Sequence, residues 1–447
     1  MHSEEGSTLN DVVIHKFGGS CLRDSSDIDL ITKMIAKQQS KTIIVVSALW
    51  GVTDRLLRAA NEPRYATRLV SDLRKQHLRF SPLLDVSIFA EKFTKVLAGI
   101  DKSLHNLSKN PESYVDVNTL LAAGERLSAL VVANELRKQG MDAHPVGSED
   151  VGICLNGTDT AASVDIENSI KKLDHAAFFG IPVITGWFGE GRDGNLALLS
   201  RGGSDHSAAA IARILDAKKL ILWKDVDGVL SINPRWGVET KPIPYLGYDE
   251  ARELSRMDAP VIHHTTVIPI KDFGIPIEIR NLNSKTEVNA PTVIGPNIID
   301  SNQLKAVGCL RSVAKITTEI GDIENQGKIL GQILIQMNKE NITCWSVESN
   351  PSKIDIVVSQ QQLTVAENII QAESIITNVD LFSCLISFIG TNDRNIVEEQ
   401  LKKGKANYSD LIYLNSTKLS VQYVANTVDI KQLMENLSTV VAKKRSV

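Results

Sequence analysis

A lysine and two glycines stand at the end of the first apolar run of the sequence, VVIHKFGGSC at residues 12 to 21. Glycine backbone can approach a ligand closely, and its N–H groups can bind phosphate oxygens beside an ammonium group. Lys16, Gly18 and Gly19 could therefore form a cradle for an anion. A turn with a surface lysine would give the same pattern, so this stretch alone leaves both interpretations open.

A second candidate site is SRGGSDHSAAAIARIL, at residues 200 to 215, where two glycines, a serine and an aspartate precede an expected helix. The free N–H groups and the macrodipole at a helix start favour bound anions. Arg201 can hold a carboxylate through two hydrogen bonds. Asp205 can only accept hydrogen bonds when ionised, so it would orient an ammonium group or a nearby lysine. A capped helix after a turn is the alternative interpretation.

A third candidate is LWKDVDGVLSINPR, at residues 222 to 235, in which carboxylates follow an expected strand. Asp225 and Asp227 could meet ribose hydroxyls or a magnesium ion. Arg235 is far enough along the chain to reach a phosphate. An ordinary Asp-Gly turn would also account for this pattern.

Two further stretches carry polar residues beside apolar ones. In AAGERLSALVVANEL, residues 122 to 136, we expect Glu125 at the start of a helix, where it would face the helix dipole or a substrate ammonium. VVSALWGVTD, residues 45 to 54, repeats the strand, glycine and helix order of the first stretch. Ser47, Gly51 and Thr53 could supply hydroxyl and N–H groups to a second anion.

Composition excludes several classes of protein. The chain has 447 residues, of which 43% are hydrophobic and 23% charged, so two or three globular domains are expected. A net charge of −4 gives no reason to expect nucleic acid or an anionic membrane as a partner. No apolar run is long enough to span a bilayer, and the polar first ten residues do not resemble a signal peptide. Five scattered cysteines without a CxxC pair favour reduced thiols in the cytoplasm.

Hydrophobic periodicity predicts a parallel sheet covered by helices. Strands are expected at residues 12–16, 42–47 and 219–223, and helices at 26–38, 118–139 and 204–215. This alternation is typical of an α/β domain, in which ligands bind at the carboxyl ends of the strands.

The pattern changes near residues 285–312, where an Asn-, Pro- and Gly-rich stretch predicts a linker or domain edge. Beyond it, strands and helices alternate on a shorter scale and predict two small β-α-β-β-α units.

Taken together and in this order, the motifs resemble those of the aspartate kinases of the amino-acid kinase superfamily, over nearly the whole chain. The resemblance rests on KFGGSC, SALWGVT, GERLS, SRGGSD, DVDG and NPR, which begin at residues 16, 47, 124, 200, 225 and 233. The paired C-terminal units resemble the family's tandem ACT domains, which are ferredoxin-like α+β units.

The resemblance implies a domain organisation. It places an amino-acid-kinase-like catalytic domain at 1–295 and tandem ACT regulatory domains at 304–447. One ACT unit interrupts the other, so the first would cover about 313–378 and the second about 304–312 plus 379–447. We expect a dimer or tetramer that forms through the ACT units. These units could also bind an amino-acid effector.

The implied activity is phosphorylation of the β-carboxylate of L-aspartate by ATP with Mg²⁺, the first step towards lysine, threonine and methionine. Lys16 and Asp205 would be catalytic, with Asp205 orienting Lys16. The residues implied to bind aspartate are Ser47, Thr53, Glu125, Arg201 and Ser204. Those implied to bind the nucleotide are Lys16, Gly18, Gly19, Ser20, Lys224, Asp225 and Arg235.

Some positions depart from the family pattern. Ala122, Ser200 and Asn233 replace its Ser, Gly and Asp, and Pro260 replaces a lysine that contacts ATP phosphates. His263 and His264 are not expected to bind a metal, because adjacent side chains point apart on a helix or strand. A divergent protein with another carboxylate substrate, or a weakly active or non-catalytic regulatory subunit, therefore stays open beside the kinase.

Overall fold

The computed structural model describes residues 11–200, 202–257, 262–284, 292–298, 303–319, 323–403 and 409–441. Arg201 and Pro260 lie outside these residues. The chain divides into two compact units. The first comprises Met1–Val229, Pro244–Arg252 and Val261–Asn297, and the second comprises Leu230–Ile243, Glu253–Pro260 and Ile298–Val447.

This division differs from the expected single boundary near residue 295. The segment Leu230–Ile243 joins the second unit because Ile232 and Trp236 are buried in the same hydrophobic cluster as Val307 and Phe388. The backbone N–H of Val307 also donates to the carbonyl of Ser231. Such a long-range association has no local sequence signal.

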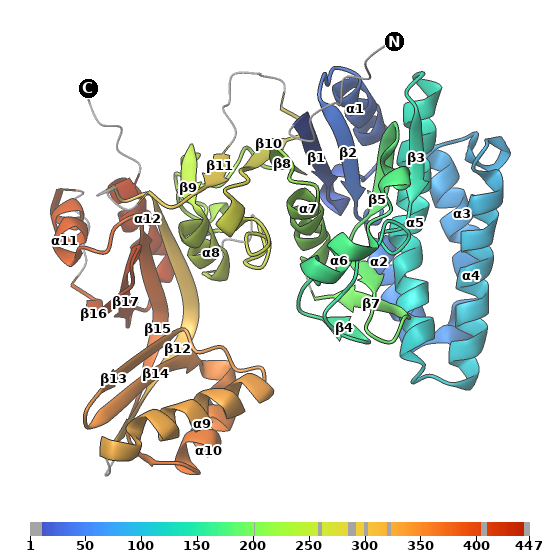
Figure 1. Cartoon of the computed structure of the whole chain (residues 1–447). Helices are drawn as coiled ribbons and strands as arrows, with labels where there is room; N and C mark the ends of the chain where they lie inside the picture. Colours follow the sequence, from blue (N-terminus) through green and yellow to red (C-terminus); the bar gives the residue numbers. More distant parts are fainter. Residues whose placement is uncertain are drawn as a thin grey trace. The chain divides into compact units, whose positions relative to one another are not determined.

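An eight-stranded sheet organises the first unit (Figure 1). In spatial order its strands are β3 (Ala143–Val146), β5 (Ile181–Thr185), β2 (Lys41–Val46), β1 (Val12–Phe17), β8 (Lys219–Lys224), β10 (Ile277–Asn281), β11 (Thr292–Gly295) and β9 (Tyr245–Gly247). Pairing is parallel from β3 through β10, antiparallel between β10 and β11, and parallel between β11 and β9. The expected mostly parallel α/β sheet is therefore confirmed. A small separate sheet contains β4 (Thr160–Ala161), β7 (Leu196–Leu199) and β6 (Phe188–Glu190).

Helices flank the large sheet, as the sequence predicts (Figure 1). They are α1 (Ser25–Ile35), α2 (Val52–Asn61), α3 (Leu69–Phe80), α4 (Ala90–Lys109), α5 (Tyr114–Lys138), α6 (Ile166–Lys172) and α7 (Gly203–Ile214), followed by α8 (Tyr248–Arg256), which runs from the first unit into the second. Helix α5 contacts β3 and β5 of the sheet and also α2 and α4, so it is covered on several sides. That environment explains its run of apolar and small residues.

Glu125 lies in the middle of α5, so its expected position at a helix start is wrong. The helix begins earlier because the Ser113 side chain accepts a hydrogen bond from the backbone N–H of Asp116 and caps the first turn. The sequence contains this signal, a serine followed three residues later by an acidic residue. Glu125 is consequently a buried carboxyl group inside a helix and has no role as a dipole partner.

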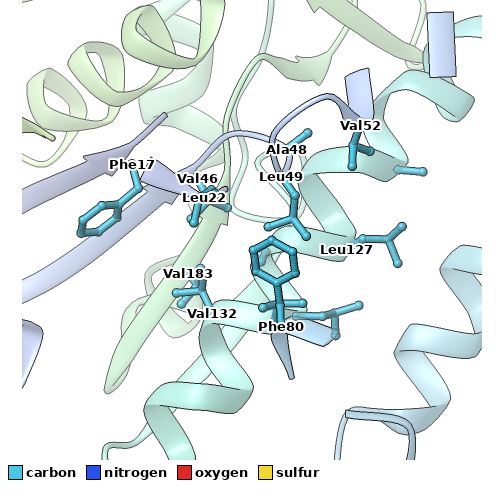
Figure 2. Packing of buried hydrophobic residues seen from close by; sticks show 14 of the residues in the cluster. Phe17, Leu22, Val46, Ala48, Leu49, Val52, Phe80, Leu127, Val132 and Val183 are labelled. Atoms are coloured by element: carbon cyan, nitrogen blue, oxygen red, sulfur yellow. The ribbon is translucent and has the colours of Figure 1, made fainter. Parts of the chain in front are cut away.

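The main hydrophobic core of the first unit packs α5 against the sheet and the segment after β2. Figure 2 shows Phe17, Leu22, Val46, Leu49 and Leu127 among its members. All five are at most 1% exposed. This packing holds the ends of β1 and β2 beside α5.

The second unit contains a six-stranded antiparallel sheet. In spatial order its strands are β13 (Ser346–Asn350), β14 (Lys353–Ser359), β12 (Ala306–Glu319), β15 (Ile375–Ile389), β17 (Ser420–Ala425) and β16 (Leu411–Ser416). Its helices are α9 (Gln326–Lys339), α10 (Leu363–Gln371), α11 (Arg394–Lys403) and α12 (Ile430–Val441).

Two hydrophobic clusters share this sheet, because β12 and β15 are long enough to contribute to both. One cluster contains residues of α9 and α10, including Ile333 and Ile370. The other contains residues of α11 and α12, including Leu401 and Leu437. The α+β character expected for the C-terminal region is confirmed, although both halves use one continuous sheet.

A pair of glycines in neighbouring helices tests this packing. A Cβ at Gly124 of α5 would lie 2.9 Å from the Ala48 Cβ, whereas one at Gly99 of α4 would have no atom within 4 Å. We expect Gly124→Ala to destabilise the protein by about 1–3 kcal/mol through overpacking. Gly99→Ala should stabilise it by roughly 0.5–1 kcal/mol, because alanine favours helix. Urea denaturation measures both changes, and equal effects would contradict the close packing at Gly124.

Candidate active site

The carboxyl ends of β1, β2 and β8 meet at one edge of the large sheet. Lys16 of β1 lies opposite Val45 of β2 and Leu222 of β8 in the strand register. The backbone N–H of Ser47, just after β2, donates to the carbonyl of Phe17. The glycine-rich stretch after β1 and the segment after β2 are therefore neighbours, at the edge where parallel sheets bind ligands.

Asp205 bridges two lysines at this edge. Its Oδ1 lies 2.5 Å from the Lys16 Nζ, and its Oδ2 lies 2.7 Å from the Lys224 Nζ. The side chains of Lys16 and Asp205 are only 6% and 7% exposed, whereas that of Lys224 is 18% exposed. Asp205 stands in the first turn of α7, so the helix brings a carboxylate to two cations from adjacent strands.

Charge and burial oppose each other in this cluster. Burial lowers the pKa of Lys16, and the nearby charge of Lys224 lowers that pKa further. Asp205 acts in the opposite direction, but the pKa of Lys16 is lowered overall. Burial would raise the pKa of Asp205, but the two ammonium groups outweigh burial and hold that pKa well below its usual range. Asp205 is therefore ionised at neutral pH, and the group carries two cations on one anion.

Glycines leave room at the cluster. A Cβ at Gly18 would lie 3.2 Å from the Lys16 Nζ, and one at Gly19 would lie 3.4 Å from the Ala48 carbonyl oxygen. Gly202, just before α7, has a φ of +82°, and a Cβ there would lie 2.4 Å from the His263 Cβ. Only glycine combines that backbone conformation with that approach. Of the glycines predicted to form an anion cradle, Gly18 thus lies beside the lysine ammonium and Gly19 beside the segment after β2.

Glu125 presents a buried carboxyl group towards the same region. It is 2% exposed, and its Oε2 atom has no hydrogen-bond partner. Burial raises its pKa to about 8, although a backbone hydrogen bond from Ala48 and the charge of Lys16 act in the opposite direction. An unpartnered carboxylate oxygen in a dry site is suited to accept from a ligand ammonium.

The remaining residues predicted to bind aspartate or the nucleotide differ in their position and burial. Ser47 and Thr53 are half-buried after β2, and Ser204 is half-buried in the first turn of α7. Ser20 lies in the short 3₁₀ helix η2 (Gly19–Cys21) after β1, and Asp225 is exposed after β8. Arg235 belongs to the second unit, in η6 (Pro234–Trp236), and Arg201 lies outside the described residues.

His206, for which the sequence predicted no role, anchors the start of α7. Its Nε2 accepts a hydrogen bond from the backbone N–H of Val164, and its Nδ1 lies 2.9 Å from the Thr265 carbonyl oxygen. Nδ1 must therefore carry the proton, and burial lowers the pKa of this ring. Its place directly after Asp205 was the only signal in the sequence.

The expectation that His263 and His264 point apart is wrong. Their ring centroids lie 4.2 Å apart with planes tilted by 37°. The reason is that the segment from Ile262 consists of turns, so helix and strand geometry do not apply. Among the described residues, no group of three or more His, Cys, Asp or Glu side chains is placed to hold a metal ion. No helix in the described ranges is long and apolar enough to cross a membrane.

Comparison with known proteins identifies the family to which this chain belongs. The model of the amino acid kinase family matches residues 11–281, and the chain therefore belongs to that family. The match spans the large sheet from β1 to β10, including Lys16, Asp205 and Lys224.

Relatives that the chain matches include aspartokinases. The chain is 30% identical over 323 residues to the bifunctional aspartokinase/homoserine dehydrogenase 1 of Arabidopsis thaliana, covering 68% of this chain and 34% of that protein. It is 27% identical to aspartokinase 3 of Bacillus subtilis, covering 88% of this chain and 89% of that one. The crystal structure of Escherichia coli aspartokinase III with aspartate and ADP shares the fold, with a TM-score of 0.77 at 18% identity over 97% of this chain and 100% of that chain. The chain spans about a third of the length of the two bifunctional relatives of Arabidopsis thaliana that it matches.

The raised pKa of Glu125 predicts how stability depends on pH. Between pH 4.5 and about 8 the folded protein binds this proton while the unfolded chain releases it, so folding stability falls as pH rises. Glu125→Gln should leave the melting temperature nearly unchanged at pH 5. At pH 9 the same substitution should raise the melting temperature by about 5 °C or more.

Thermal denaturation of the ligand-free protein across this pH range measures the effect. Glu91→Gln, at an exposed carboxyl group of α4, is the control and should show no such pH dependence. A pH-independent difference between Glu125→Gln and wild type would contradict the buried, protonated state.

Proposed function

We propose that this protein is an aspartate kinase that transfers the γ-phosphoryl group of ATP to the β-carboxylate of L-aspartate, giving ADP and 4-phospho-L-aspartate. The observation that carries the proposal is the buried Asp205 carboxylate bridging Lys16 and Lys224 at the carboxyl edge of the sheet. Family membership and the names of the relatives support it. Two cations held in place beside glycine backbone are suited to phosphoryl transfer.

The reaction needs positioning and charge neutralisation rather than a base. An oxygen of the β-carboxylate, already ionised, forms a bond to the γ-phosphorus while the bond from that phosphorus to the ADP oxygen breaks. Lys16, fixed by Asp205, would lie against the transferring group, and Lys224 would bind the leaving phosphates. The backbone N–H groups of Gly18, Gly19 and Ser20 would complete the cradle.

The two backbone ends of aspartate need opposite charges. Glu125 would accept hydrogen bonds from the ammonium group, and Arg201 would hold the α-carboxylate. Ser47, Thr53 and Ser204 would supply hydroxyl groups. The buried, unpartnered Oε2 of Glu125 supports its assignment, because binding an ammonium would compensate its desolvation.

Mg²⁺ would accompany ATP and neutralise charge on its phosphates. Mg²⁺ is usually held by substrate phosphates together with one or two carboxylates. Asp225, exposed after β8, is the carboxylate suited to the ribose or to this ion. Arg235 is proposed for the phosphates, where it would compensate for Pro260.

A changed carboxylate substrate or a non-catalytic regulatory role is the second candidate, favoured by the proline at position 260. Incubation with ATP, aspartate and hydroxylamine separates these functions. An aspartate kinase gives aspartyl hydroxamate, and a pure binding subunit gives none.

The wider role follows from the proposed activity. The product would feed the routes to lysine, threonine and methionine in the cytoplasm, and the C-terminal unit would act as tandem ACT domains that bind an amino-acid effector. Inhibition by lysine is expected to be weaker or differently selective than in lysine-inhibited relatives, because the loop GDIENQGKILG and the segment ESNPSK lack the pattern associated with that form.

Removing the central cation tests the catalytic assignment. Lys16→Met should lower aspartyl hydroxamate formation by about 10³-fold or more, because a cation at the transferring group is lost. Lys218→Met, at an exposed lysine just before β8, is the control and should keep wild-type activity. Near-normal turnover in Lys16→Met would exclude the cradle.

The aspartate contacts are tested by separating the two Michaelis constants. Arg201→Ala and Glu125→Ala should each weaken aspartate binding by about 2–5 kcal/mol while changing the KM for ATP little. Glu135→Ala, at a glutamate of α5 paired with Lys138, serves as the control. Equal effects on both substrates would argue against these assignments.

The oligomer is tested on the full chain. Apolar side chains on the strands of the second unit are exposed, including Leu381 at 53% and Ile412 at 54%. We expect a dimer or tetramer in sedimentation velocity, weakened by Ile412→Glu and unchanged by Val428→Glu in a loop. A stable wild-type monomer would refute association through these units.

A further inference from the structure

A cavity of about 440 Å³ lies in the first unit, between α4, α5 and the carboxyl ends of β3 and β5. Helix α5 contributes Thr119, Ala123, Arg126 and Leu130, which are spaced three or four residues apart and share one face. Glu125 belongs to another face of α5, turned towards Ala48 and Lys16. The cavity is therefore separate from the proposed active site.

Part of the cavity wall is apolar. Val96 and Ile100 of α4 face Leu130 of α5, and Pro145 and Val146 close the side formed by β3. The volume falls within the range of about 300–1,000 Å³ that is usual for small-molecule sites. An apolar body of roughly the size of two fused rings would be buried there.

Gly99 keeps the cavity open. It stands inside the 20-residue helix α4, where alanine would give a more stable helix. A Cβ at this position would have no atom within 4 Å, so no packing contact requires a glycine. The missing side chain instead adds to the open space that Gly99 lines.

The rim of the cavity carries uncompensated positive charge. Lys92 and Lys95 are exposed on one face of α4 and make no ion pair within the part of the chain that the structure describes. Arg126 is already paired with Glu149 and lies 5.2 Å from the Phe188 ring centroid. Asp150 also lines the cavity, where its Oδ2 accepts from the backbone N–H of Gly147 at 3.3 Å. The negative charge of Asp150 is smaller than the combined positive charge of Lys92 and Lys95, so the rim has a net positive charge.

We propose that this cavity binds a small organic anion, with its apolar body against Val96, Ile100 and Leu130 and its acidic group at Lys92 and Lys95. The proposal rests on the cavity alone and is independent of the phosphoryl-transfer assignment.

The probe is 8-anilinonaphthalene-1-sulfonate, a fluorescent anion with a naphthalene and a phenyl ring, titrated into the full-length protein. We expect saturable binding of one molecule per chain. Gly99→Leu should weaken it by about tenfold or more, because the side chain fills the apolar space. The double variant Lys92→Glu/Lys95→Glu should weaken it by about tenfold through charge reversal at the rim.

Matched variants show whether the effects belong to this cavity. Gly331→Leu, at another open helix glycine, and Lys102→Glu, at an exposed lysine of α4, should both bind the probe as wild type does. Circular dichroism verifies folding, and the charge variants remain informative if Gly99→Leu is unstable. The neutral analogue N-phenyl-1-naphthylamine should bind more weakly to wild type and respond only to Gly99→Leu.

Three results would overturn the proposal. They are no saturable binding to wild type, binding unaffected by both the Gly99 and the lysine substitutions, and equal affinity for the neutral analogue. Probe fluorescence is measured without ATP or aspartate, so it does not depend on kinase activity. An inactive protein could still bind the probe, and an active kinase could fail to bind it, so the two proposals can fail independently.

Discussion

The first unit depends on one buried electrostatic arrangement, the Asp205 carboxylate held between Lys16 and Lys224. A lysine almost wholly removed from water is costly unless a partner compensates it. Asp205 supplies that compensation from α7, while both lysines come from adjacent parallel strands. Without the carboxylate, two ammonium groups would repel each other at short range. With it, they form a rigid cationic surface.

That arrangement constrains the surrounding backbone. The carboxylate can reach the lysines only if α7 begins close to the sheet edge, and Gly202 permits this through its positive φ and its approach to His263. His206 fixes the same turn through the backbone of Val164 and Thr265. The cluster thus explains why glycines and a neutral, buried histidine occur together at the start of this helix.

Much of the fold of the first unit and of the position of its candidate site could be predicted from the sequence, because the sequence signals are local. The apolar runs gave the strands β1, β2 and β8, and the glycine-rich stretches marked the sheet edge. What could not be predicted depends on distant contacts: the segment around Trp236 joins the second unit by packing, and β12 runs continuously through two cores. Glu125 lies inside α5 because the short polar cap at Ser113, and not the beginning of the apolar run, sets where the helix starts.

Helix α5 shows how stability and function can conflict within one element. Its packing favours small and apolar residues, yet it carries a carboxyl group whose Oε2 has no partner and whose pKa burial raises to about 8. A glutamine would satisfy the same space without a titrating proton. Under the proposed function, the ammonium group of aspartate would complete the site at this glutamate when it binds. Under that proposal, the cost of ionising Glu125 in the empty protein would give selectivity for an ammonium-bearing ligand, because a neutral ligand would leave the carboxyl group protonated and without a charged partner.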